Sequence, residues 1–213
     1  MDPRSNRITS VRIDEQTIWL ALADGRALAE PIQRHIRLEK ATPEQRLAWV
    51  LTDEGHGLDW PALWQPSAAG MVSVWDLDQD SLYRQAMDAL LAAQWDVTRI
   101  SAVHRELVAL WRMEADINNG GFLQFLGNWG LANHQLTLQA LQAIGAPITR
   151  QCLQDMFAVL KRFEEGPENV DYSDLPALLT DAEHAQLQEL EEAFWDYPEP
   201  LNKLVVMHYG PAQ

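Results

Sequence analysis

WRMEADINNGGFLQF, residues 111–125, contains the clearest helix boundary in the chain. Asparagine tolerates the left-handed backbone conformation that ends a helix, and glycine adopts it freely, so Asn118 to Gly121 predict a break. Phe122 and Phe125 would then anchor a second helix in the core. The stretch therefore predicts two consecutive helices, and this packing role requires no ligand.

The rest of the chain after residue 76 also reads as helices, because its apolar residues recur at spacings of three and four. Asp80 with Ser81 could cap one helix, and Thr98 could start the next. Further helices are expected over 122–129, 135–144, 150–163, 181–195 and 198–209. The predicted architecture of this part is an α-helical bundle.

The first sixty-odd residues follow a period of two instead, which favours strands. Strands are expected over 8–13, 17–22 and 26–29, with Asp24-Gly25 as a hairpin turn between the last two. A short helix over 32–38, a helix capped by Thr42 with Pro43 at its first position, and a strand over 49–51 complete the unit. These elements predict a small α+β domain.

The change of period falls in a proline and small-residue stretch, Gln65 to Gly70, which is typical of a linker. We therefore predict an α+β N-terminal small domain over 1–66, a linker over 67–75 and an all-α C-terminal helical bundle over 76–213.

The composition is that of a folded protein. The chain has 213 residues, of which 47% are hydrophobic and nine are tryptophan. A single cysteine, Cys152, excludes an intrachain disulfide and fits a reducing compartment. The sequence has no apolar run of membrane-spanning length, and its start lacks the hydrophobic stretch of a signal peptide. We therefore expect a cytoplasmic protein.

The charge is strongly negative and uneven. Sixteen Lys and Arg against 31 Asp and Glu give a net charge of −15, which disfavours direct binding to nucleic acid or an anionic membrane. Residues 1–75 have a net charge of −2 and residues 76–213 of −13. Between 163 and 199 there are twelve carboxylates and no Lys or Arg. This segment is the strongest candidate for an interaction surface.

The usual catalytic arrangements are missing from the sequence. The six histidines do not fall at metal-ligand spacing, and no phosphate-binding glycine loop is present. Cys152 lies on a predicted helix and is expected to be a buried apolar side chain. Glu114 and Asp116 fit polar packing and capping better than an acid/base pair. We predict neither an enzyme nor a bound metal or cofactor, and a deep pocket with His56 or His104 beside carboxylates would contradict this.

Two resemblances to known families add to this interpretation. The first covers about residues 5–66 and rests on Asp24-Gly25-Arg26, a later proline, Trp49 and the stretch Gly55 to Pro61. These residues resemble a short bacterial domain of unknown function whose ending usually reads W-P-x-L-D, where this chain has Leu63-Trp64. Members occur alone, beside toxin–antitoxin-like genes or fused to helix-turn-helix modules. The resemblance implies a fold and no reaction.

The second resemblance covers roughly residues 76–213 and rests on the Asn-Asn-Gly-Gly-Phe stretch with the Ile-Gly-Ala string at 144–146. It is to an all-helical bacterial family typified by an acidic, dimeric DNA-mimic protein that binds a helix-turn-helix transcription factor in place of its operator. Leu126 replaces an aromatic residue of the family pattern. The motif residues, expected to be structural, are Glu114, Asn118, Asn119, Gly120, Gly121, Phe122, Gln124, Phe125 and Asn128. The resemblance implies a homodimer and a basic DNA-binding partner.

The chain's own carboxylates could support such mimicry. Side chains three or four apart on a helix have Cβ atoms about 5–6 Å apart, a spacing that can imitate a row of phosphates. On the helix from Asp181, Leu187 and Phe194 fall on one side and the carboxylates on the other. The predicted partner-binding residues are Glu164, Glu165, Glu168, Asp171, Asp174, Asp181, Glu189, Glu192 and Asp196.

Two other interpretations stay open at this point. Acidic, solvated helix faces also serve solubility alone. Alternatively, the protein is an antitoxin-like or immunity-like module whose N-terminal domain recognises its partner through Trp49, Trp60 and Trp64.

Overall fold

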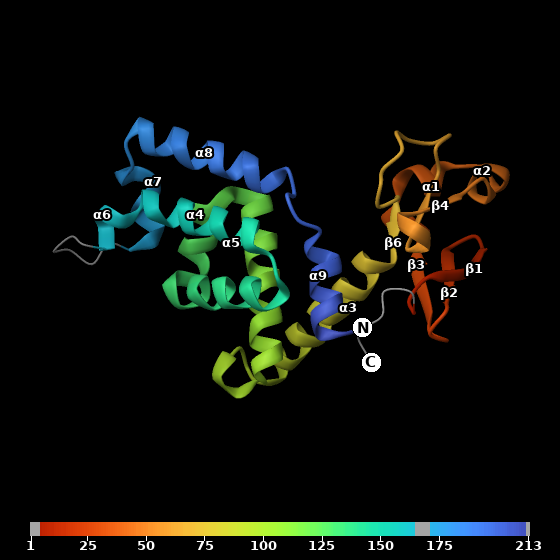
Figure 1. Ribbon diagram of the computed structural model, residues 1–213, viewed down its shortest axis with the longest axis horizontal. Helices are drawn as coiled ribbons and strands as arrows, with labels where there is room; N and C mark the ends of the chain where they lie inside the picture. The colour runs from red at the N-terminus through yellow and green to blue at the C-terminus, as the bar shows by residue number, and fades with distance from the viewer. Residues whose placement is uncertain (1–4, 165–170, 212–213) are drawn as a thin grey trace. The chain divides into compact units, whose positions relative to one another are not determined.

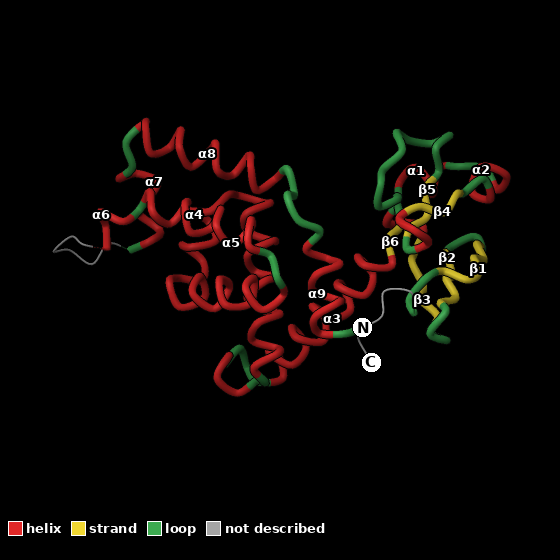
Figure 2. The backbone as a smooth tube through the Cα atoms, in the orientation of Figure 1, coloured by secondary structure: helices red, strands yellow, loops and turns green. Residues whose placement is uncertain are grey.

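The computed structural model describes residues 5–164 and 171–211. The described chain forms two compact units, one containing the residues up to Ser81 with Gly210 and Pro211, the other Leu82–Tyr209. Among the residues that the structure describes, strands occur only in the first unit, and the second is helical (Figures 1 and 2). This confirms the predicted α+β N-terminal part and helical C-terminal part.

Three strands of the first unit form an antiparallel sheet in the order β1-β2-β3. Their bounds are β1 Ile8–Ile13, β2 Thr17–Leu22 and β3 Ala27–Pro31. Ile18, Leu20 and Leu22 alternate along β2 and are buried, so one face of the sheet carries the core. The Asp24-Gly25 turn joins β2 to β3 with Gly25 at φ 87°, as the hairpin prediction requires.

A second antiparallel sheet and several short helices complete the first unit. The strands are β4 Val50–Thr52, β5 Gly57–Asp59 and β6 Val72–Ser73, in the order β4-β5-β6. The helices are η1 Ile32–Arg34, α1 Ile36–Lys40, α2 Pro43–Leu47 and η2 Asp53–Gly55. Thr42 and Gln45 form a capping box at the start of α2, with Pro43 at its first position, which confirms the predicted cap.

The remaining described helices follow in chain order. They are α3 Val74–Ala92, η3 Val97–Arg99, α4 Ala102–Ile144, α5 Pro147–Val159, α6 Lys161–Glu164, η4 Tyr172–Asp174, α7 Leu175–Leu178, α8 Asp181–Trp195 and α9 Leu201–Tyr209. Phe122 and Phe125 are completely buried, as predicted. Among the described residues, no helix is both long and apolar enough to cross a membrane.

Two helix starts differ from the prediction: α3 begins earlier in the chain than expected and α4 begins later. The helix expected from Asp80 begins at Val74, where the Ser73 hydroxyl accepts a hydrogen bond from the Trp75 amide at 3.2 Å. The helix expected from Thr98 begins at Ala102, because Ser101 provides the N-cap and accepts from the amide of His104. The stretch predicted as a linker, 67–75, thus includes β6 and the start of α3, and the domain boundary stays a prediction.

Helix α4 is interrupted twice. Gly121 has φ 84° and ψ −178°, and Gly130 has φ 69° and ψ −178°, a region of backbone space essentially reserved for glycine. The first break confirms the one predicted from Asn118 to Gly121. Figure 1 shows α4 as consecutive helical pieces that change direction. This change of direction lets residues of α4 on both sides of Gly121 face α8.

Candidate functional site

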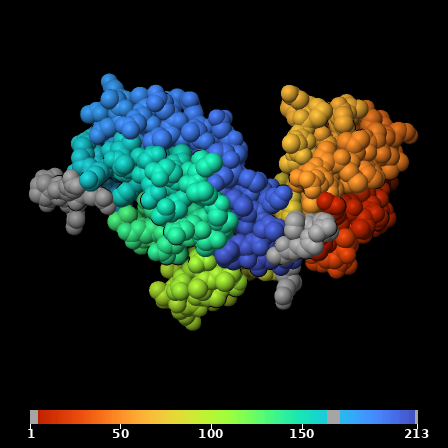
Figure 3. Space-filling view, viewed as in Figure 1, coloured from red at the N-terminus to blue at the C-terminus, as the bar shows by residue number. Residues whose placement is uncertain are grey.

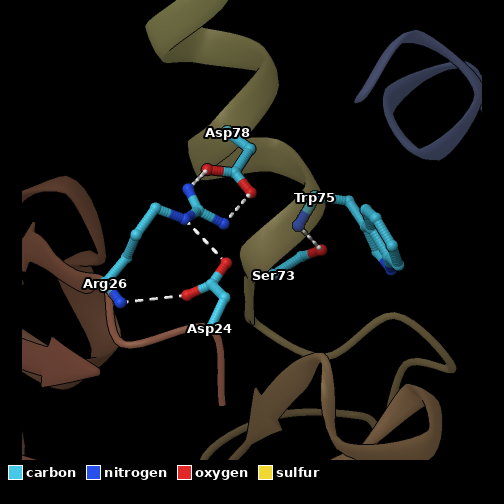
Figure 4. Close-up of polar contacts among 5 residues, drawn as sticks. All are labelled: Asp24, Arg26, Ser73, Trp75 and Asp78. Atoms are coloured by element: carbon cyan, nitrogen blue, oxygen red, sulfur yellow. Dashed lines mark hydrogen bonds and ion pairs between the residues drawn. The ribbon is translucent and has the colours of Figure 1, made fainter. Parts of the chain in front are cut away.

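The Asp-Gly-Arg motif of the first unit is a structural ion-pair cluster (Figure 4). The Arg26 guanidinium donates to both carboxylate oxygens of Asp78, at 2.5 and 3.0 Å, and its Nε donates to Asp24 at 2.8 Å. The Asp78 side chain is only 1% exposed. The hydrogen bonds to Asp78, ahead of those to Asp24, raise the pKa of Arg26. The motif therefore ties the β2–β3 turn to the start of α3.

The glycine motif of the second unit brings α8 against the first break in α4. At this break the amide of Phe122 donates a hydrogen bond to Glu191 of α8 at 2.6 Å. A Cβ added to Gly121 would lie 2.4 Å from Oε1 of Glu191. Burial raises the pKa of Glu191, while the hydrogen bond from Phe122 opposes that rise. Gly121 thus permits the close approach of a carboxylate.

Other motif residues converge on a single carboxylate, Asp116. Its oxygens accept hydrogen bonds from Gln124 at 2.9 Å, Asn128 at 3.0 Å and the indole of Trp129 at 2.5 Å. Glu114 instead accepts from the hydroxyl of Tyr83 at 2.5 Å. These contacts give both carboxylates structural partners.

The two adjacent asparagines of the motif, Asn118 and Asn119, lie at the surface. Asn118 accepts a hydrogen bond from the hydroxyl of Tyr197 at 3.1 Å. Nearby, the indole of Trp195 donates to the carbonyl of Ile117 at 3.2 Å. The end of α8 is therefore fastened to the last turn of α4 before the break.

Six of the nine predicted partner-binding residues lie in the described chain with exposed side chains. Asp171 precedes η4 and Asp174 is its last residue. Asp181, Glu189 and Glu192 lie on α8, and Asp196 directly follows it. Leu187 and Phe194 are buried on the opposite side of α8, as helical periodicity predicts. Figure 3 shows α8 at the molecular surface. Glu165, Glu168 and the side chain of Glu164 lie outside the described residues.

Several other carboxylates of the acidic segment have structural partners. Glu199 accepts from the amides of Ile148 and Thr149 and thereby caps α5, which sequence reasoning missed. Glu183 forms the capping box of α8 with Thr180 and pairs with Arg162 at 2.7 Å. Arg162 lies just before the stretch without basic residues, so the neutralisation of Glu183 by Arg162 was not expected. The exposed acidic face of this segment therefore contains fewer carboxylates than the run of twelve in the sequence suggests.

Glu183 gives the first testable prediction. The hydrogen bond from Arg162, followed by the one from the Thr180 amide, lowers the pKa of Glu183 to about 2. A carboxyl whose pKa is lower in the folded state stabilises that state at pH values above the ordinary pKa of the carboxyl. This contribution is lost as the pH falls toward about 2. Glu183→Gln should therefore cost about 1 kcal/mol of unfolding free energy at neutral pH and almost nothing near pH 2.

Unfolding by guanidinium chloride at both pH values measures this change in unfolding free energy. Glu189→Gln is the matched control on the same helix. A cost for Glu183→Gln that does not change with pH would contradict the assignment.

The cysteine and a buried histidine, groups that an enzyme could use, both have structural contacts. The thiol of Cys152 donates to the carbonyl of Leu190 at 3.2 Å, and burial, assisted by Asp155, raises its pKa to about 11. His56 is buried and stacks on Trp75 with ring centroids 4.6 Å apart. Within residues 5–164 and 171–211, no group of three His, Cys, Asp or Glu could hold a metal ion. These observations give no catalytic arrangement in the described part.

The three tryptophans of the alternative interpretation differ in exposure. Trp60 is 1% exposed, and its indole donates to the carbonyl of Arg46 at 2.8 Å, so it is a core residue. Trp49 is half-buried. Trp64 is 52% exposed and lies under the guanidinium of Arg37, 3.3 Å from the ring centroid. Only Trp64 of the three has the exposure that a recognition residue requires.

Comparison with known families assigns both parts of the chain. A family model described as a DMP19-like protein matches residues 98–209, and one described as a protein of unknown function (DUF2442) matches residues 8–87. Neither description names an enzymatic activity. No curated protein and no solved structure matches the chain. Because the first match covers more than half of the residues, and includes the glycine motif and α8, the chain belongs to the family of DMP19-like proteins.

Proposed function

We propose that this protein is a noncatalytic, acidic binding protein that imitates DNA and sequesters a basic DNA-binding partner, most concretely a helix-turn-helix transcription regulator. Membership of the DMP19-like family fits a DNA-mimic-like role. The observation that carries the proposal is the outer face of α8, where Asp181, Glu189, Glu192 and the following Asp196 are all exposed. Homodimerisation, which the family resemblance implies, stays a prediction.

The spacing of these carboxylates supports the proposal. With a helical rise of about 1.5 Å per residue, Glu189 and Glu192 are separated by about 4.5 Å along the axis, and Glu192 and Asp196 by about 6 Å. Phosphates of one DNA strand are separated by about 3.4 Å along the duplex axis. The row is thus less dense and less regular than the phosphates of one DNA strand, but it has the same sign and lies on one side of the helix. A basic groove shaped for phosphates can contact several of these carboxylates at once.

Charge removal at matched positions tests the proposal. The triple variant Glu189→Gln, Glu192→Gln and Asp196→Asn should capture the partner from a cell lysate about 10- to 100-fold more weakly, since each lost ion pair is worth roughly 0.5–1 kcal/mol. Capture by the unaltered protein should fall steeply with salt, and duplex DNA should compete with it. The readout is quantitative mass spectrometry of the captured proteins at low and high salt.

The control variant removes three charges elsewhere: Glu15→Gln, Glu39→Gln and Asp88→Asn, all exposed positions. It has the same net charge as the test variant and should capture the partner normally. Equal capture by both variants, or no competition by DNA, would contradict mimicry and leave solubility as the role of the acidic face. Loss of capture in Trp64→Ala would instead favour recognition through the N-terminal unit.

A further inference from the structure

A small hollow opens beside the acidic face, between α4 and α8. It has a volume of about 390 Å³, and its lining includes Gly120, Leu123, Leu187, Gln188, Glu191 and Trp195. This volume is at the lower end of the range for small-ligand pockets, about 300–1,000 Å³, and is far too small for a duplex or a folded element. The hollow suits a single side chain or a small molecule.

The walls of the hollow combine apolar side chains with three polar ones, His184, Gln188 and Glu191, of which only Glu191 is a carboxylate. The Nε2 atom of His184 lies 3.1 Å from the carbonyl of Pro176. Leu123 and Leu187 contribute aliphatic surface, and Trp195 is 40% exposed. Oε1 of Glu191 is engaged by the amide of Phe122. Among the described residues, no cation pairs with Glu191 and no second hydrogen bond reaches it. Burial raises the pKa of this carboxyl, so a cation brought to it from outside would relieve an unfavourable charge.

The glycine motif shapes this hollow. Gly120 lines it without a side chain, and Gly121 allows Glu191 to reach the amide of Phe122. The carbonyl of Ile117 holds the indole of Trp195 in place at 3.2 Å. A motif that the sequence indicates as packing alone thus also positions the carboxylate and the aromatic ring of one concave site.

We propose that the hollow receives an arginine side chain from the partner that the acidic face of α8 binds, an inference that rests on the proposed function. An arginine stem can lie along aliphatic walls while its planar guanidinium stacks on an indole. The same guanidinium can donate to the remaining oxygen of Glu191. Lysine offers a compact charge and no planar surface to stack, so it fits the arrangement less well. Glu191 and Trp195 would then give the complex a specificity that the surface charges alone do not provide.

The test uses the full chain and a blocked amino acid, N-acetyl-arginine amide, as the probe. The indole N–H signal of Trp195, assigned by its loss in Trp195→Phe, is followed by NMR during titration at millimolar probe concentrations. We expect a saturable shift with the arginine probe and none with N-acetyl-citrulline amide, which has the same shape without the charge. An equal shift with the citrulline probe would overturn the inference.

Two variants locate the binding. Glu191→Gln keeps an oxygen that can accept from Phe122 and should weaken probe binding about tenfold, the effect of losing one charge-assisted contact. Gln188→Phe fills the hollow from an exposed position of α8 and should abolish the shift. Asp88→Asn, which removes an exposed carboxylate of the same unit outside the lining, should bind the probe normally. Normal binding by Gln188→Phe, with its fold confirmed by thermal melting, would overturn the inference.

The two proposals fail separately. If charge-dependent capture of the partner is observed and the arginine probe does not shift Trp195, the hollow is not an arginine site and the proposed function stands. If the probe binds in the hollow and the acidic face captures no basic partner, the site is supported and the proposed function is lost.

Discussion

Replacing Arg26 with methionine should lower the unfolding free energy of the N-terminal unit by about 3 kcal/mol, since removing one partner of a buried ion pair leaves the other charge uncompensated. Asp78 would lose both guanidinium hydrogen bonds while remaining buried. Because the Arg26 side chain is still 25% exposed, we expect the lower end of the range for such pairs. Guanidinium unfolding of the variant and the unaltered chain measures the difference.

The matched control is Arg12→Met in the same unit. Arg12 is 67% exposed and lies 3.5 Å from Asp14, so its loss should cost no more than about 1 kcal/mol. The double variant Arg26→Met with Asp78→Leu should recover much of the lost stability, since an apolar pair can replace a buried ion pair. Similar costs for Arg26→Met and Arg12→Met would show that the cluster is not what fastens the turn to α3.

This ion-pair cluster also shows the limit of what the sequence predicts. Asp24, Gly25 and the hairpin are local features, so turn chemistry and alternation locate them correctly. The partner of Arg26 is 52 residues away, and nothing near Asp78 distinguishes it from the other carboxylates. The late start predicted for α3 has the same origin. Ser73 was a less obvious cap than Asp80 with Ser81, and only the buried contacts of Val74 and Trp75 show that the helix begins earlier.

The candidate site divides in the same way. The limits of α8 and the exposure of Glu189, Glu192 and Asp196 follow from a cap and a helical period, and both are local. The pairing of Glu183 with Arg162 and the contact of Glu191 with Phe122 join separate elements. The second break of α4, at Gly130, falls between the helices predicted over 122–129 and 135–144, so it too follows from local sequence. The hollow beside α8 could not be predicted because it lies between two helices, and no local pattern shows which residues of α4 and α8 come together.

A substitution in the glycine motif should also cause a large loss of stability. Gly121→Ala should destabilise the helical unit by about 3 kcal/mol or more, because two costs add. A side chain in this glycine-only backbone region costs roughly 1–3 kcal/mol. In addition, the new Cβ would lie 2.4 Å from Oε1 of Glu191, so this carboxylate must move and leave the amide of Phe122 without its acceptor. Losing a helix cap of this kind costs about 1 kcal/mol.

Gly130→Ala separates the two costs. Gly130 has nearly the same backbone angles, and a Cβ added there would meet no atom within 4 Å. Its substitution should therefore cost the backbone strain alone and be milder than Gly121→Ala in guanidinium unfolding. Adding Glu191→Ala to Gly121→Ala should remove the clash and leave the strain, so the second change should cost less in that background than in the unaltered chain. Equal losses for Gly121→Ala and Gly130→Ala would mean that Glu191 yields freely, and that the motif is conformational only and does not hold a carboxylate in place.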